Sequence, residues 1–445
     1  MEKKIYHIII FFVIILLLLS GCTENTNNDN ENDGNNKYDK NDDKKEKSEF
    51  SGYIKKYNSK TLESHFGFMH PEHFGEINEL NVSWHRPHAG PFIWGEIQKS
   101  NEEFDWEDAD YEVKRSQYYG LNILATIWPF ADWDQKTCNE ELSSTQTKMF
   151  FELGSYRNKP CDIESYKNFV KKLVERYDGD GVDDMPDLIV PIKYWEVSNE
   201  PSMQEELVFF TGSSSDYYDI LKATYEAVKQ ADETSYIVSG GMAGVANDNK
   251  EFWEKVFDFG GSNYFDIGNI HSISSDSDSL YGEEYKEFLD DNKIEKIFWT
   301  TEAELKSNSL QGVKPSEESY AKVIVKNYVE AFSSGSDKIF YVGLENSPGD
   351  EESWLIGKTG EKQEPYYAYK TMVTKLDYFD KVEKIVDGQF KFTIDTKIVY
   401  VLWGTNDINE DITGQIKITD LKGTEKTIDS NTLILNDSPV FVEKI

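Results

Sequence analysis

The sequence predicts an α/β fold: a (β/α)8 TIM barrel followed by a small C-terminal antiparallel β domain. Three observations support this prediction. Short apolar runs recur from Ser64 onward, longer amphipathic segments lie between them, and after Asp387 strand-like runs follow one another without a helix. A doubly wound open sheet is the alternative, but no glycine-rich phosphate loop follows the first apolar run. The barrel is therefore the preferred class.

Residues 1–22 predict a lipoprotein signal peptide rather than part of the fold. Lys3 and Lys4 precede an apolar run, Ile8 to Leu19, that is short for a membrane span. The run ends in Leu-Ser-Gly-Cys, which resembles a bacterial or archaeal lipobox with Cys22 as the lipidated residue. An ordinary signal peptide or an uncleaved anchor is the alternative. We therefore expect an extracytoplasmic protein, attached to the membrane surface through a lipid on Cys22.

Residues 23–50 predict a disordered polar linker. They are dominated by Asn, Asp, Lys and Glu, and they contain too little apolar surface to offset the entropy of an ordered chain. The barrel is expected over residues 51–386 and a β-sandwich-like accessory domain over 387–445. The net charge of −35 argues against nucleic acid as a partner, because phosphate binding needs clustered Lys and Arg.

Eight strand–helix units account for the stretch after the linker, as a barrel requires. The expected strands are His65–Met69, Val82–Arg86, Leu121–Trp128, Ile192–Val197, Tyr236–Gly240, Phe265–His271, Lys296–Thr301 and Lys338–Gly343. The expected helices are Trp106–Tyr119, Ile163–Arg176, Ser215–Gln230, Lys250–Phe259, Glu283–Asn292, Ser316–Ser333 and Tyr366–Leu376. The accessory domain is expected to contain strands at Gln389–Ile394, Lys397–Trp403, Gly414–Thr419 and Val440–Ile445.

Two glutamates at the ends of predicted strands are the strongest functional signal. Glu200 follows the fourth strand in Asn199-Glu200-Pro201, and Glu302 ends the seventh. Barrel sites form at the carboxyl ends of the strands, so both side chains can enter one pocket. Two carboxyls about 5 Å apart can break a glycosidic bond with retention, one attacking the anomeric carbon and the other protonating the leaving oxygen. Glu304 is the main alternative for the attacking group.

The segment Trp195-Glu196-Val197-Ser198-Asn199-Glu200-Pro201 resembles the strand-four signature of a clan of glycoside hydrolases built on (β/α)8 barrels. Trp299-Thr300-Thr301-Glu302 resembles the clan's strand-seven motif. The resemblance implies that Glu200 is the acid/base, Glu302 is the nucleophile and Asn199 binds the sugar 2-hydroxyl. Within the clan, the trailing β domain resembles that of family 39 β-xylosidase-like enzymes.

Further residues at strand ends are candidates for contacting substrate. The resemblance implies that Arg86, at the end of strand two, keeps the nucleophile ionised, and a structural salt bridge is its alternative. His271 ends strand six, where clan members often carry His or Tyr, although Ile273 replaces the Tyr of their common His-x-Tyr pattern. Aromatic and imidazole groups can stack on sugars or bind their hydroxyls, with core packing as the alternative; these candidates are His85, Trp128 and Trp133.

Two structural sites are also expected outside the pocket. Cys138 and Cys161 predict a disulfide in an oxidising compartment, with two free thiols as the alternative. An acidic turn resembles calcium loops of the Asp-x-Asp-Gly-x-x-Asp type, because calcium binds several hard oxygens on a flexible turn. A solvated acidic turn is equally compatible with the pattern, and its proposed ligands are Asp178, Asp180, Asp184 and Asp187.

These observations favour a retaining β-glycoside hydrolase that acts on extracellular oligo- or polysaccharide without a cofactor. A structural calcium is its only expected metal. Two alternatives stay open: a non-catalytic carbohydrate-binding surface lipoprotein, and a transglycosylase that uses the same two glutamates.

Overall fold

The computed structural model describes residues 59–69, 74–100, 103–147, 150–203, 209–272, 279–304, 316–343, 355–357, 359–405 and 407–445. All belong to the larger of two units, Tyr53–Ile445. The expected signal peptide, its Cys22 and the polar linker lie outside the described residues. Among the residues described, no helix is both long enough and apolar enough to cross a bilayer.

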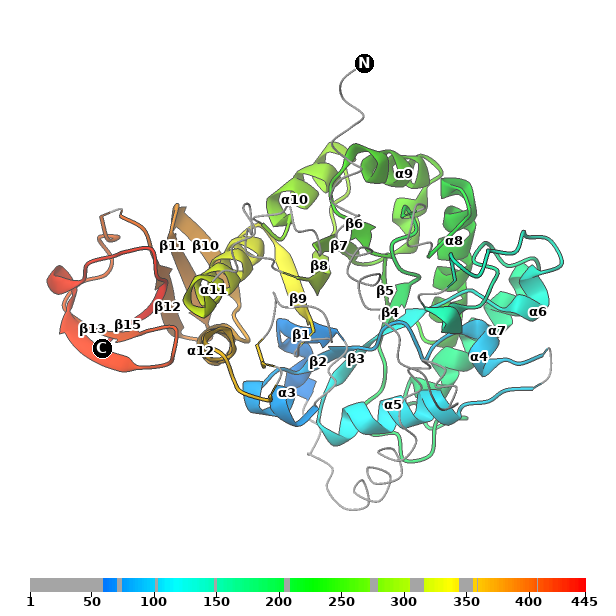
Figure 1. Cartoon of the computed structure of the whole chain (residues 1–445), viewed down its shortest axis with the longest axis horizontal. Coiled ribbons are helices and arrows are strands. Elements are labelled where there is room, and N and C mark those ends of the chain that lie inside the picture. The colour runs from blue at the N-terminus through cyan, green and yellow to red at the C-terminus, as the bar shows by residue number, and fades with distance from the viewer. Residues whose placement is uncertain are drawn as a thin grey trace, which may run out of the picture. The chain divides into compact units, whose positions relative to one another are not determined.

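A parallel sheet forms the centre of the molecule, with strand order β5-β4-β3-β2-β1-β9-β8-β7-β6 (Figure 1). The outermost strands, β5 and β6, are almost consecutive in sequence, and Val238 at the end of β5 also pairs in parallel with Ile267 before β7. The two short strands therefore act as one interrupted fifth strand, which closes an eight-stranded barrel. The strands are β1 (Phe66–Met69), β2 (Trp84–Arg86), β3 (Asn122–Ile127), β4 (Tyr194–Val197), β5 (Tyr236–Val238), β6 (Met242–Ala243), β7 (Gly268–Ser272), β8 (Phe298–Ala303) and β9 (Ser336–Val342).

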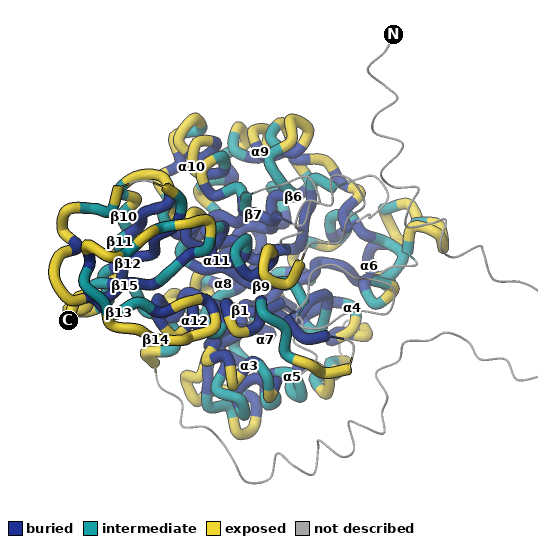
Figure 2. The backbone as a smooth tube through the Cα atoms, turned by 60° about the vertical axis from the view of Figure 1, so that its left-hand side comes forward, coloured by how far each residue is buried: buried dark blue, intermediate teal, exposed yellow. Residues whose placement is uncertain are grey.

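Helices lie around the barrel (Figure 2), and their buried apolar residues belong to two core clusters that they share with the strands. All seven expected helices are present, and the structure adds α3 after β1. The barrel helices are α3 (Phe74–Leu80), α5 (Glu107–Tyr118), α7 (Ile163–Tyr177), α8 (Ser214–Ala231), α9 (Asn247–Asp258), α10 (Gly282–Asp291), α11 (Glu317–Ser333) and α12 (Glu364–Leu376). Shorter pieces are α4 (Trp94–Ile97), α6 (Asp132–Gln135), η1 (Ser59–Glu63), η2 (Phe151–Leu153), η3 (Gly261–Tyr264) and η4 (Ser430–Thr432).

Local chemistry explains where the longest helices begin. The Asp162 side chain accepts hydrogen bonds from the Glu164 and Ser165 amides and so caps α7. Ser213 and Asp216 form a reciprocal capping box at the start of α8. These caps satisfy amides that a helix leaves without intrahelical partners, so each helix starts at a defined residue.

The interior of the barrel near the amino ends of its strands is filled by an apolar cluster, the aromatic layer: Trp84, Leu124, Val238, Ile267, Trp299 and Phe340. Lys338 lies over the rings of Trp84 and Trp299 and donates to the carbonyl of Ser64 at 2.8 Å. The barrel is therefore packed solid at this end, as small barrels are.

The C-terminal residues form one antiparallel sheet in the order β10-β11-β12-β15-β13-β14. Its strands are β10 (Lys381–Val386), β11 (Gln389–Ile394), β12 (Lys397–Leu402), β13 (Gln415–Thr419), β14 (Glu425–Asp429) and β15 (Val440–Lys444). The expected boundary at 387 is too late, because β10 pairs with β11 and belongs to this sheet. Its Lys- and Glu-rich sequence hides the alternation that marks a half-buried strand. The described residues form a single sheet rather than the two facing sheets of a sandwich.

The sheet is joined to the barrel by apolar and ionic contacts. Phe390 and Phe392 of β11 belong to the same buried cluster as Tyr369 and Met372 of α12. Lys375 of α12 donates to Glu425 of β14 and Glu443 of β15, at 2.8 Å each. Burial raises the pKa of Glu443, but hydrogen bonds from Lys375, Lys397 and Lys417 outweigh this effect and lower it to about 2.

Candidate active site

Glu200 is placed in the barrel mouth by an unusual turn after β4. Ser198 and Glu200 both have positive φ, 63° and 41°, a region that side chains other than glycine rarely adopt. The turn brings Asn199 and Glu200, which are neighbours in sequence, to the same side of the strand end. Both are almost fully buried. Such strained residues gather at functional sites, where the surrounding structure holds them in place.

Glu302 is directed inward by an irregularity in β8. Across the pairing with β7, Ile270 lies opposite Thr300 but His271 lies opposite Glu302, so Thr301 is an extra residue in β8. A bulge of this kind changes the direction of the side chains around it. As a result Thr301 and Glu302, consecutive in sequence, both contact residues of the barrel interior.

The two carboxyl groups meet in one place together with His271 of β7. One carboxylate oxygen of Glu200, one of Glu302 and one ring nitrogen of His271 all lie within 4.8 Å of one another. His271 Nδ1 lies 2.9 Å from Glu200 Oε1 and 3.6 Å from Glu302 Oε1. Strands β4 and β8 thus bring together two carboxyls that are about a hundred positions apart in sequence.

Arg86 at the end of β2 connects the acidic groups. Its Nη1 donates to Glu302 Oε1 at 2.8 Å, its Nε to Glu196 Oε2 at 2.8 Å, and its Nη2 to Asn199 Oδ1 at 2.7 Å. Arg86 is fully buried, and its described contacts are with protein. It therefore orients Glu302 and Asn199, and its bond to Glu302 is the contact that the resemblance implies.

The two carboxyls have unequal electrostatic surroundings. Burial raises the pKa of Glu200 to about 7, opposed by the more distant Arg86 charge and increased by Glu196. Burial also raises the pKa of Glu302, but His271 and the directly bonded Arg86 counteract it. Burial lowers the pKa of His271 to about 4, so its ring is neutral at pH 7. Glu302 is the carboxyl bonded to the cation, whereas Glu200 is the one bonded to a neutral ring.

Asn199 offers an unused donor. Its Oδ1 accepts from Arg86, which fixes the orientation of the amide, and its Nδ2 is buried with no hydrogen-bond partner among the described residues. A buried amide nitrogen without a partner costs free energy unless a ligand satisfies it. The amide therefore has a vacant donor beside Glu200.

The three other residues expected to contact substrate have protein partners. His85 faces the outer side of β2, where Nδ1 lies 3.0 Å from Ser116 Oγ of α5, because neighbours in a strand point to opposite faces and Arg86 points inward. Trp128 is fully buried and donates to the carbonyl of Ala89, so it leaves no ring face for a sugar. Trp133 packs its edge against Trp94 and donates to the carbonyl of Gln98 at 2.7 Å.

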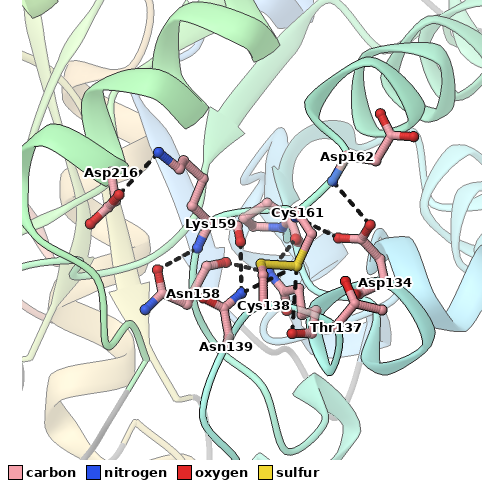
Figure 3. Close-up of a disulfide and its surroundings, with 11 residues drawn as sticks. Asp134, Thr137, Cys138, Asn139, Asn158, Lys159, Cys161, Asp162 and Asp216 are labelled. Atoms are coloured by element: carbon pink, nitrogen blue, oxygen red, sulfur yellow. Dashed lines mark hydrogen bonds and ion pairs between the residues drawn. A yellow bond between two sulfur atoms is a disulfide. The ribbon is translucent and has the colours of Figure 1, made fainter.

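Cys138 and Cys161 form a disulfide in the segment between β3 and α7, and Figure 3 shows its surroundings. Their Cα atoms are 5.9 Å apart. Asp134 lies beside the bond and accepts from the Cys161 and Asp162 amides at 2.7 and 3.1 Å. The bond therefore ties the end of α6 to the start of α7.

The acidic turn between α7 and β4 brings three of its four predicted ligands together. Carboxylate oxygens of Asp178, Asp180 and Asp184 lie within 4.8 Å of one another, and Asp187 is not part of this group. Asp184 accepts from the amides of Gly179 and Gly181 at 3.1 and 2.8 Å. Three converging carboxylates are suitable ligands for calcium, but the same turn is also held by its own hydrogen bonds.

Five buried residues beside the carboxyls form a set that we call the polar layer: Arg86, Thr126, Glu196, Asn269 and Thr301. Glu196 is fully buried and accepts from Arg86, from Thr126 at 2.5 Å and from Asn269 at 2.6 Å. Asn269 and Thr301 were not predicted from the sequence. Asn269 shares the inward face of its strand with His271, which is a detectable signal, but the bulge that lets Thr301 and Glu302 both face inward is a property of strand pairing.

Searches among protein families and curated proteins give no match to this chain. Solved structures do match. A family 39 β-xylosidase from Caulobacter crescentus aligns with TM-score 0.59 at 14% identity, over 88% of this chain and 98% of that one. A glucosidase from Croceicoccus marinus gives 0.59 at 11%, over 86% and 96%. The catalytic domain of a family 30 xylanase C from Talaromyces cellulolyticus gives 0.53 at 15%, over 88% and 98%. The chain therefore has the (β/α)8 barrel fold, with a C-terminal β domain, that these glycoside hydrolase structures share.

Proposed function

We propose that this chain is a retaining β-glycoside hydrolase that acts on extracellular oligo- or polysaccharide. One observation supports this most directly: carboxylate oxygens of Glu200 and Glu302 lie within 4.8 Å of each other. Retaining glycosidases hold their two carboxyls about 5 Å apart, whereas inverting enzymes need about 6.5–9.5 Å to admit a water between them. The fold shared with a β-xylosidase, a glucosidase and a xylanase agrees with this proposal.

In the first step Glu302 attacks the anomeric carbon and forms a glycosyl–enzyme bond, while Glu200 gives its proton to the departing oxygen. The assignment follows from the surroundings. Arg86 donates to Glu302 and favours its ionised form, and burial keeps Glu200 protonated up to a pH of about 7. In the second step Glu200 takes a proton from water, which releases the sugar from Glu302 with its configuration retained.

Asn199 and Arg86 support these steps. The vacant Nδ2 of Asn199 lies on the same turn as Glu200 and can donate to a sugar hydroxyl at the 2-position. Such bonds strengthen in the transition state and add several kcal/mol to catalysis. Arg86 binds Asn199 and Glu302 together, so it fixes the position of this donor relative to the nucleophile. No cofactor enters the proposed steps.

A panel of aryl β-glycosides tests the proposal, with Glu200→Gln and Glu302→Gln as variants. We expect turnover by the unmodified chain, and a loss of roughly 10⁴-fold or more in kcat for Glu302→Gln. The Glu200→Gln variant should lose most on poor leaving groups, which need the proton, and azide should restore its turnover of dinitrophenyl glycosides. Glu304→Gln is the matched control, because it removes the neighbouring carboxyl and should retain most activity.

Three other outcomes contradict the proposal. Calorimetric binding of sugars without turnover of any glycoside would make the chain a carbohydrate-binding module. Transfer of the sugar to added acceptor sugars in preference to water would make it a transglycosylase. A first-formed product of inverted configuration, read by NMR, would exclude the retaining mechanism.

We also propose that the domain is held outside the cytoplasm by a lipid on Cys22. The support is the lipobox-like sequence and the polar stretch that follows it. Metabolic labelling with a radioactive fatty acid should mark the chain, and Cys22→Ala should abolish both the label and its recovery with membranes. Unchanged labelling of that variant would contradict the anchor.

A further inference from the structure

A continuous set of hydrogen bonds leads from Asn269 to Glu200. Thr301 Oγ1 lies 2.9 Å from Asn269 Oδ1, His271 Nε2 lies 2.8 Å from Thr301 Oγ1, and His271 Nδ1 lies 2.9 Å from Glu200 Oε1. All four residues are buried. The direction of the bonds, and so the location of each proton, follows from the partners at the Asn269 end.

The amide of Asn269 has only one orientation that satisfies its neighbours. Its Nδ2 lies 2.6 Å from Glu196 Oε1 and 3.2 Å from the carbonyl oxygen of Ser239, and both of these atoms accept hydrogen bonds. Nδ2 must therefore be the donor on this side. The Oδ1 on the other side is an acceptor, and it also receives the Thr301 amide at 3.3 Å.

The Thr301 hydroxyl has one proton and two neighbours that can only accept it. These are Asn269 Oδ1 at 2.9 Å and Glu196 Oε1 at 3.1 Å. Whichever of them receives the proton, Thr301 Oγ1 presents only a lone pair to the third neighbour, His271 Nε2. His271 must therefore carry a hydrogen on Nε2.

We propose that Asn269 and Thr301 lock His271 in its neutral Nε2–H tautomer, so that Nδ1 accepts the proton of Glu200 and holds that residue as the acid. His271 is then a positioning residue for the acid/base rather than a sugar ligand. The inference rests on the proposed function and deepens it, because it identifies which groups keep the catalytic proton on Glu200.

The charges around the imidazole agree with this assignment. The ring faces Glu200 from the turn after β4 and Glu302 from β8, with Arg86 of β2 and Glu196 of β4 also acting on it. Glu302 Oε1, 3.6 Å from Nδ1, is beyond hydrogen-bond range and is already bonded to Arg86. Burial lowers the pKa of His271 to about 4 and raises that of Glu200 to about 7, so between these values the shared proton belongs to Glu200.

The ring is also held in place sterically. A Cβ on Gly241, between β5 and β6, would overlap His271 Nε2 and the two adjacent ring carbons, so only a glycine leaves this space for the imidazole. The hydrogen bonds at both nitrogens and the backbone against the ring together prevent the imidazole from turning over.

The lock has a direct consequence for the reaction. While Glu200 is protonated, it donates a hydrogen bond to Nδ1 of His271. Once Glu200 is ionised, its oxygen and Nδ1 both present lone pairs, and this hydrogen bond is lost. The lock therefore opposes loss of the proton to solvent. When substrate is present, the Glu302 carboxylate forms its bond to the anomeric carbon, the glycosidic C–O bond breaks with its electron pair on oxygen, and that oxygen takes the Glu200 proton.

The tautomer can be read without any activity measurement. Imidazole ¹⁵N NMR of the full chain, labelled in its seven histidines, distinguishes protonated from bare ring nitrogens, and comparison with His271→Gln identifies the signal. We expect a hydrogen on Nε2 and a bare Nδ1 at pH 6. A hydrogen on Nδ1, alone or together with Nε2, overturns the inference. If the expected tautomer occurs in a chain that cleaves no glycoside, the proposed function fails while the lock stands.

Thr301→Val removes the lone pair that selects the tautomer but keeps the shape of the side chain. The ring can then donate from Nδ1 to ionised Glu200, so the basic limb of the pH profile of kcat/KM should move down by about one unit. At pH 7 the loss should be roughly tenfold for poor leaving groups and small for dinitrophenyl glycosides, which need little acid assistance.

Thr300→Val is the matched control, because Thr300 is equally buried in β8 but its hydroxyl contacts Ser336 at 3.0 Å. It should leave the basic limb in place. If Thr301 had only a structural role, Thr301→Val would lower activity on all leaving groups alike and leave the basic limb of the pH profile in place. That result would overturn the inference.

Discussion

The two ends of the barrel interior are built from the same strands and differ completely in chemistry. In the aromatic layer, β2, β7 and β8 contribute Trp84, Ile267 and Trp299. Two residues further along each strand, on the same face, lie Arg86, Asn269 and Thr301 of the polar layer. One end is stabilised by apolar burial, whereas the other holds charges whose burial costs free energy unless every partner is present. The apolar residues that stabilise the barrel and the polar residues beside the carboxyl pair thus lie only about two positions apart along the same strands.

The largest effect is expected from breaking the polar layer at its cation. Arg86→Met leaves Glu196 and Glu302 buried without their guanidinium, which should cost about 3–5 kcal/mol in the free energy of unfolding. It should also lower kcat/KM by roughly 10³-fold or more, because the pKa of Glu302 rises further and fewer molecules carry an ionised nucleophile. The acid limb of the pH–rate profile should therefore move to higher pH.

Arg176→Met is the control for that variant. Arg176 makes a comparable bond, to Asp110 Oδ1 at 2.8 Å, but between α7 and α5 outside the barrel. It should not move the acid limb. If both variants shift the limb equally, the polar layer has no special role in ionising Glu302.

The next effect tests the opposite end. Trp299→Ala removes a ring that packs against Trp84 and lies under Lys338, and truncating a buried aromatic residue costs about 3–5 kcal/mol. Chemical denaturation should show this loss, while the pH limbs of the surviving activity stay in place. A change in the pH profile would show that the two layers are coupled and would break the comparison.

The difference between the layers also explains what the sequence could predict. All eight barrel strands were identifiable, because apolar runs of the right length mark their positions whatever the register. Arg86, Glu200 and Glu302 were identifiable as residues at strand ends. His85 was a candidate because it lies next to Arg86, but neighbours in a strand face opposite sides, and His85 contacts Ser116 of α5. Thr301 was missed because Glu302 was expected to face inward, and only a bulge, which is a property of strand pairing, lets two consecutive residues face inward together.

A third test uses the pH dependence of stability at the polar end. Burial raises the pKa of Glu200 from its ordinary value of 4.5 to about 7, so the folded chain holds this proton more tightly than the unfolded chain. The stabilisation is complete below about pH 4.5 and is lost as the pH rises through 7. Glu200→Gln cannot ionise and loses none of it. Relative to this variant, the unmodified chain should become less stable by about 3 kcal/mol between pH 4.5 and pH 8.

Denaturant unfolding at four or five pH values between 4.5 and 8 measures that difference. Taking the unmodified chain minus the variant removes the contributions of all other groups that titrate in this range. If the free energies of unfolding of the two chains change with pH in the same way, Glu200 is ionised in the folded chain at neutral pH. That result would also remove the support for Glu200 as the acid.

The smallest expected effect concerns the acidic turn before β4, at the same end of the barrel as the aromatic layer. We predict that calcium binds Asp178, Asp180 and Asp184 and stabilises the fold, by about 1.4 kcal/mol when its concentration is ten times its Kd. Thermal unfolding with calcium and with EGTA should show this shift in Tm, and Asp180→Asn should reduce it.

Asp180 is the suitable position, because Asp184 also accepts hydrogen bonds from two backbone amides and its loss would disturb the turn itself. Magnesium, which prefers fewer protein ligands, is the control ion. Since the turn lies at the amino end of β4 and the carboxyl pair at the other, calcium should change Tm without changing the pH limbs of activity. An unchanged Tm would assign the turn to its own hydrogen bonds alone.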